Sequence, residues 1–380
     1  MANDALPISP SVLSWARERA GYSIDEAAET FRRIASWEAG EGGPTYPQLE
    51  QLAEKFGLPV AVFFFPEPPA SPAIRESFRT LPDAEFKKIP RRITKLVRKA
   101  KAMQLNIAEL GDGKNPSPRL ITREISLSEN ADVEVASTSI RNFLGISIDD
   151  QFGWQNSDIA LKAWRRAVQS VGIFVFKEAF HEDDFSGISL FDEIFPIIFV
   201  NNSTAKTRQI FTVMHELAHL LFHTSGVDTT NDNGIFALDG HDRQIEILCN
   251  NLASNILVPE AAFLSVVEGL DHSERSAEAI ATKFSVSREM IYRKFLDRRW
   301  IDKVQYLDAA RKWSEQFQPA GSPGGDYYWT KLSYLGDEYV RLALKSFSQN
   351  KIDEQQLGEY LDTKPRNIAT LTERFQKAAE

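Results

Sequence analysis

Residues 211–223 read Phe-Thr-Val-Met-His-Glu-Leu-Ala-His-Leu-Leu-Phe-His and hold a His-Glu-x-x-His pattern inside an apolar run. On a helix, residues four apart lie on the same face, one turn from each other. His215 and His219 can therefore each direct a ring nitrogen at a single metal ion, while Glu216 can reach a water molecule beside that ion. Two histidines and a neighbouring carboxylate base in this spacing are typical of zinc hydrolases.

A chance match on a core helix is the alternative interpretation of this motif. Histidine is rare in the chain, with six among 380 residues, so a chance match has odds on the order of one in a hundred. The flanking residues are apolar on nearly every side of the helix, which predicts that the helix is buried. Buried histidines beside a carboxylate cost free energy unless a metal ion or hydrogen bonds satisfy them. These observations favour a metal site.

The third protein ligand has to come from elsewhere in the chain, because a catalytic zinc site uses three protein ligands and keeps one position open for water. A glycine and a third histidine shortly after His219 would mark one class of zinc peptidase. Phe222 and Ser225 stand at those positions, which excludes that class. The other common choice is a glutamate on a following helix.

Residues 242–257 are predicted to form that following helix, which Pro259 ends. Apolar residues recur along it at helical spacing, namely Ile245, Leu248, Cys249, Leu252 and Ile256. Glu246 lies beside this stripe and is predicted as the third ligand, with Asn250 one turn later as a hydrogen-bond partner that orients a ligand. Two alternatives stay open. Glu246 could lie on a solvated helix face, or the third ligand could come from the set His223, His241, Asp239 and Cys249.

Residues 211–219, followed by Glu246-Ile-Leu-Cys-Asn-Asn-Leu-Ala-Ser-Asn-Ile-Leu-Val-Pro259, resemble the ImmA/IrrE family of bacterial and phage metallopeptidases. The resemblance implies zinc held by His215, His219 and Glu246, with Glu216 as the catalytic base, in a zincin-like domain of the gluzincin type. It also implies that the substrate is a regulatory protein, such as a helix-turn-helix repressor or an antitoxin. Cleavage would release a stress, prophage or defence operon.

Length and composition exclude several classes of protein. At 380 residues, with 43% hydrophobic and 26% charged residues, the chain is expected to form two or three ordinary globular domains. No apolar run is long enough for a membrane span and no signal peptide is evident, so we expect no membrane partner. The single cysteine forbids an internal disulfide, which favours a reducing cytoplasm. The net charge of −9 argues against a chain that coats nucleic acid.

Residues 1–69 are predicted to form a small helical domain, in which capping signals at Ser23 and Thr45 open two of the helices. The segment resembles the DNA-binding domain of phage repressors, an XRE-like helix-turn-helix fold, although it is shorter than that pattern where the recognition helix would begin. Five basic residues stand against ten acidic ones, which is the wrong sign for phosphate contacts. DNA is therefore one candidate partner, beside a protein-docking or structural role.

Residues 70–130 are predicted as a basic helical linker, with ten basic against three acidic residues between positions 75 and 101. We interpret the helix after Pro90 as a connector that pairs with acidic groups of the same chain, with phosphate contact as the alternative. The other predicted parts are a catalytic domain, a helical extension with a helix-turn-helix rhythm and a C-terminal helical domain, at residues 131–265, 266–318 and 319–380.

The catalytic domain is predicted to hold a small sheet. Residues 172–176 form one strand, and residues 187–191 and 195–201 form a hairpin in which Pro196 favours an edge position. An edge strand just before the metal helix would let an extended peptide add as a further strand. The surrounding segments are expected to be two helices and a polar loop, at residues 133–144, 159–171 and 228–242. The chain is thus predicted to be a mainly helical α+β protein.

Two functions from other classes compete with a zinc endopeptidase. One is a DNA-binding transcriptional regulator whose zinc is structural or sensory. The other is a toxin–antitoxin or phage-defence component that acts through a bound partner.

Overall fold

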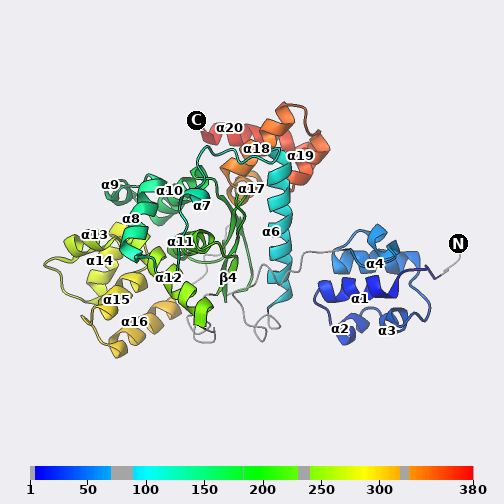
Figure 1. Ribbon diagram of the computed structural model, residues 1–380, viewed down its shortest axis with the longest axis horizontal. Helices are drawn as coiled ribbons and strands as arrows, with labels where there is room; N and C mark the ends of the chain where they lie inside the picture. The colour runs from blue at the N-terminus through cyan, green and yellow to red at the C-terminus, as the bar shows by residue number, and fades with distance from the viewer. Residues whose placement is uncertain (1–4, 70–88, 183, 230–239, 317–324, 380) are drawn as a thin grey trace. The chain divides into compact units, whose positions relative to one another are not determined.

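A computed structural model describes residues 5–69, 89–182, 184–229, 240–316 and 325–379 (Figure 1). In these ranges the chain is mostly helical and contains one four-stranded sheet, in agreement with the predicted α+β class. The chain divides into two compact units. The first comprises residues 1–76 with 89–96, and the second comprises residues 77–88 with 97–380.

The first unit is helical, as predicted. Its elements are α1 (Pro10–Arg19), α2 (Ile24–Ala28), α3 (Ile34–Glu38), α4 (Tyr46–Phe56) and the 3-10 helix η1 (Val60–Phe64). Both predicted capping boxes are present, at Ser23 and at Thr45. Arg17 and Glu38 form a largely buried ion pair at 2.7 Å that joins α1 to α3. Helix α3 has only 5 residues, so DNA binding by this unit stays a prediction.

The predicted basic helix after Pro90 is present as α6 (Arg91–Leu110). Its first turns belong to the first unit, where Arg91 forms an ion pair with Glu26. Its later turns belong to the second unit, where Lys99 forms an ion pair with Glu178. These two cations pair with acidic groups of the same chain, as the connector interpretation expects. The basic residues before position 89 lie outside the described residues.

The second unit is built around the sheet of β1 (Phe174–Glu178), β2 (Phe185–Leu190), β3 (Ile197–Asn201) and β4 (Gly226–Thr229), in the order β1-β3-β2-β4. Strand β3 runs parallel to β1 and antiparallel to β2, and β2 runs antiparallel to β4. The predicted hairpin is therefore correct.

The predicted edge position of the 195–201 strand is wrong, because β3 lies inside the sheet between β1 and β2. Proline cannot donate to a neighbouring strand, but Pro196 stands just before β3, where only its carbonyl is needed. The Phe174 amide donates to that carbonyl at 3.0 Å. Among the described strands the edges are β1 and β4, and the end of β4 falls in the segment 228–242 that the sequence predicts as a loop. Residues 230–239, including Asp239, lie outside the described part of the chain.

The two faces of the sheet are covered by different helices (Figure 1). Helix α11 (Lys206–Leu221) packs on β2 and β3, with α10 (Ser157–Ser170) and α12 (Gly240–Leu257) beside it. Val175, Ile198 and Val200 point into this core. The next residues along the strands, Phe176 and Phe199, lie on the opposite face, where their tilted rings are in contact with centroids 5.0 Å apart.

Further helices complete the second unit. They are α7 (Ile121–Glu124), α8 (Val133–Leu144), α9 (Ile148–Phe152), α13 (Glu260–Val267), α14 (Glu274–Phe284), α15 (Arg288–Asp297), α16 (Lys303–Gln316), α17 (Tyr327–Leu335), α18 (Asp337–Ser348), α19 (Glu354–Tyr360), η4 (Pro365–Asn367) and α20 (Ile368–Ala379). Arg165 joins α17 to the sheet, because its guanidinium donates to the carbonyls of Val175 and Tyr334. None of the described helices is by itself long and apolar enough to cross a membrane. Within the described ranges, one bent pair, α12 with α13 across a 57° bend, reaches that length and composition.

Candidate metal centre

Helix α11 carries the His-Glu-x-x-His motif through the core of the second unit. Apolar residues surround the motif, so the helix packs against the sheet, α10 and α12 at once. His215, Glu216 and His219 are 1%, 0% and 1% exposed. The burial of this helix predicted from the sequence is therefore confirmed. Polar side chains buried to this extent need hydrogen-bond or metal partners.

The two histidines and Glu246 of α12 converge on one point. The Nε2 atoms of His215 and His219 lie 3.0 Å apart. The Glu246 carboxylate oxygens lie 3.4 Å from Nε2 of His215 and 3.2 Å from Nε2 of His219. Nitrogen and oxygen ligands about 2.0–2.1 Å from a tetrahedral zinc ion stand about 3.3 Å from one another. The three donor atoms therefore fit a single ion of that size, and they form a group positioned to bind a metal ion.

The charges in this group suit a cation. Burial alone would raise the pKa of the Glu246 carboxyl, but the two imidazoles beside it outweigh burial and hold that pKa well below its usual range. The carboxylate is therefore ionised at neutral pH. Burial raises the pKa of the Cys249 thiol, which lies beside His219, so Cys249 is protonated at neutral pH.

Glu216 lies one residue beyond His215 and packs against β2. A β-carbon added to Gly187 of β2 would lie 2.5 Å from Oε1 of Glu216 and 2.5 Å from Cγ2 of Thr212. Only glycine therefore allows the helix to approach the strand this closely. The sequence interpretation did not single out Gly187, although a glycine inside a strand often marks such a close approach.

The other sequence candidates that the structure describes lie outside the group of three. His223 is exposed, and its ring stacks on Phe191 at 4.7 Å. His241 pairs with Glu129 at the surface, 2.6 Å away. The Asn250 side chain forms no hydrogen bond with another described residue, so its orienting role stays a prediction. A residue that the sequence interpretation missed, Thr224, contacts the ring of His219, with its Oγ1 3.2 Å from Nδ1.

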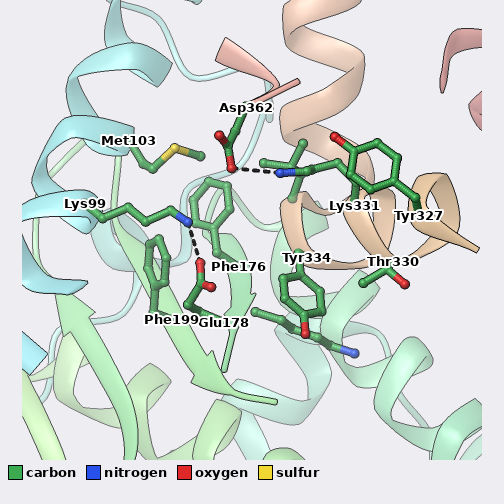
Figure 2. Close-up of a pocket in the computed structure, with 12 residues that line it drawn as sticks. Lys99, Met103, Phe176, Glu178, Phe199, Tyr327, Thr330, Lys331, Tyr334 and Asp362 are labelled. Atoms are coloured by element: carbon green, nitrogen blue, oxygen red, sulfur yellow. Dashed lines mark hydrogen bonds and ion pairs between the residues drawn. The ribbon is translucent and has the colours of Figure 1, made fainter. Parts of the chain in front are cut away.

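A separate cavity of about 220 Å³ lies on the opposite face of the sheet (Figure 2). Its walls come from α6, from β1 and β3, and from α17. Lys99 pairs with Glu178 across it, and Lys331 pairs with Asp362 at 2.7 Å. These charged groups neutralise each other in pairs and do not converge on a common point, so this cavity offers no comparable metal site.

One comparison with known proteins identifies a relationship. Residues 168–296 match the family model Peptidase_M78, described as the IrrE N-terminal-like domain. The match supports the resemblance to the ImmA/IrrE family and a metallopeptidase role. It covers the sheet, α11 and α12, and it runs beyond position 265 into α15. The first unit and the C-terminal helices lie outside it. A search of curated proteins found no match to the chain.

Proposed function

We propose that this chain is a zinc-dependent endopeptidase that cleaves a regulatory protein in the cytoplasm. One observation carries the proposal. Two imidazole nitrogens and a carboxylate, from α11 and α12, lie 3.0–3.4 Å from one another, and a second carboxylate, Glu216, follows the first histidine. The family match over this segment supports it.

The proposed reaction gives different roles to the metal ligands and to Glu216. His215, His219 and Glu246 would hold the zinc ion, which supplies a Lewis acid that activates water and polarises a peptide carbonyl. Glu216 acts as general base: it takes the proton of the attacking water and then delivers it to the leaving amine. The Glu246 carboxylate offsets part of the charge of the ion. Burial of the group strengthens each of these electrostatic interactions, because little water screens them.

The free edge of β4 is the proposed binding place for an extended segment of the substrate. Strand β4 pairs only with β2 among the described strands. Asp228 of β4 lies opposite Gly187 of β2, and Gly187 contacts Glu216. An extended peptide that added to β4 would therefore lie one strand away from the proposed base. Main-chain hydrogen bonds at an edge strand recognise an extended backbone whatever its sequence.

The proposed substrate is a helix-turn-helix repressor or an antitoxin whose loss releases a stress, prophage or defence operon. This part of the proposal rests on the resemblance to the ImmA/IrrE family, which the match over residues 168–296 supports.

The test is the Glu216→Gln variant, produced together with a candidate repressor. We expect zinc content near that of the wild type and a fall in cleavage of about 100-fold or more, because a positioned general base contributes about 10²–10⁴-fold. Mass spectrometry of the repressor fragments and zinc analysis of the purified chain measure both. Cleavage at the wild-type rate by this variant would refute the role of Glu216. An intact repressor with the wild-type enzyme would instead favour a structural or sensory zinc.

A further inference from the structure

The turn that ends α11 brings Thr224 back to the helix it has just left. The Phe222 amide donates to the Ala218 carbonyl at 3.0 Å, and the Thr224 amide donates to the His219 carbonyl at 3.0 Å. Between them His223 has a φ of 57°, the left-handed conformation that commonly ends a helix. This turn places the Thr224 side chain beside the ring of His219. If the chain continued as a helix, the side chain would instead point away from that ring.

Among the described residues, the Thr224 hydroxyl has two hydrogen-bond partners, both on His219. Its Oγ1 lies 3.0 Å from the His219 carbonyl oxygen and 3.2 Å from Nδ1 of the ring. The hydroxyl donates its single proton to the carbonyl, which can only accept. A lone pair of the hydroxyl then faces the ring, and Nδ1 has to carry the proton of that second hydrogen bond.

We infer that Thr224 is a positioning residue that selects the Nδ1–H tautomer of His219 and fixes the orientation of its ring. The inference rests on the proposed zinc site. With the proton on Nδ1, the lone pair of a neutral ring is at Nε2, the atom that lies 3.0 Å from Nε2 of His215 and 3.2 Å from Glu246. Hydrogen bonds to the second ring nitrogen of a metal ligand commonly set its tautomer and raise its affinity for the metal.

The deciding substitutions are Thr224→Val, which keeps the shape but cannot accept a hydrogen bond, and Thr224→Ser, which keeps the hydroxyl. Competition with a chelator measures the zinc affinity of the full chain. We expect Thr224→Val to bind zinc about 10–100-fold more weakly, because the loss of such an outer hydrogen bond has an effect of that size. Thr224→Ser should bind within about threefold of the wild type, a smaller change than that range.

Thr282→Val is the matched control. The Thr282 hydroxyl also donates to a backbone carbonyl, that of Glu278 at 2.9 Å, but it lies on α14 and forms no hydrogen bond with a described histidine. The zinc affinity of the Thr282→Val variant should equal that of the wild type. Thermal unfolding of each metal-free variant separates a loss of fold from a loss of affinity.

A second measurement needs no variant. In the zinc-loaded wild type, nitrogen-15 NMR should show a proton on Nδ1 of His219 and none on Nε2. A proton on Nε2 would overturn the inference, as would a Thr224→Val variant that binds zinc as tightly as the wild type. A wild-type chain that binds no zinc would refute the proposed function itself, so the two failures are distinguishable.

Discussion

The two faces of the sheet carry similar kinds of side chain and arrange them differently. On the α11 face, two histidines and Glu246 direct three donor atoms at one point and are at most 13% exposed. On the opposite face, Lys99, Glu178, Lys331 and Asp362 line a cavity (Figure 2), but Lys99 and Lys331 each pair with a different carboxylate. Charged residues around a hollow therefore do not by themselves make a site. Convergence on one point distinguishes the α11 face.

Exposure explains the different arrangements. The Lys331 and Asp362 side chains are 19% and 70% exposed, and those of Lys99 and Glu178 are 42% and 22% exposed. Water and salt screen such pairs, so each contributes about 0–1 kcal/mol to stability. The group on α11 and α12 has no such screening, and its donors need a cation or one another.

The largest expected effect is the loss of zinc on replacing Glu246. Glu246→Ala should weaken zinc binding by more than about 100-fold, because it removes a direct ligand and not only an outer hydrogen bond. Glu178→Ala on the opposite face is the matched control, and its zinc affinity should stay at the wild-type value. Metal analysis after dialysis against a chelator measures both. Stoichiometric zinc in the Glu246→Ala chain would show that Glu246 is not a ligand, and the two faces would then no longer differ in the way described above.

A somewhat smaller effect is expected from Gly187→Ala. The new β-carbon would lie 2.5 Å from the Glu216 carboxylate, so the helix or the side chain has to move. A displacement of about 1 Å costs about 100-fold in rate, while zinc affinity should change little, since the ligands are not on β2. Gly153→Ala is the control, because its nearest neighbour stands 3.3 Å away. Repressor cleavage and zinc content are measured together, and unchanged cleavage would contradict the contact.

The smallest effect concerns Lys177, which lines the cavity and forms no hydrogen bond or ion pair with the rest of the described chain. Burial, with repulsion from Arg165 and Lys206, lowers the pKa of Lys177 to about 7. The unfolded chain holds this proton up to about pH 10. Below pH 7 the buried charge destabilises the fold, and as pH rises from 7 to 10 the penalty disappears, since only the unfolded chain still binds the proton.

Lys177→Met should therefore raise the free energy of unfolding by about 1 kcal/mol more at pH 6 than at pH 9.5. Urea denaturation at the two pH values measures the difference. Lys162→Met, at an exposed position of α10, should show none. An equal gain at both pH values would mean that the Lys177 ammonium is solvated in the folded chain.

Several features were predictable because they depend on residues close together in the chain. The spacing of His215 and His219 places both on one helix face, and the capping boxes at Ser23 and Thr45 follow from neighbouring residues. The apolar stripe of residues 242–257 identified the second helix. The sequence alone could not predict the distances between Glu246 and the two histidines, since these depend on how α11 packs against α12.

The amino-acid sequence by itself determined the helices, the hairpin and the pair of histidines, since local hydrogen bonds and periodicity set these. Tertiary structure alone decided that β3 is internal, that β4 forms an edge, and that Gly187 and Thr224 meet α11. The strand order and the contact of Gly187 with α11 depend on residues that are distant in the chain. The position of Thr224 depends on the direction of a turn, which the periodicity of the sequence does not predict. The group of His215, His219 and Glu246 depends on both levels. The sequence sets its residues, and the packing of α11 against α12 sets the distances between their donor atoms.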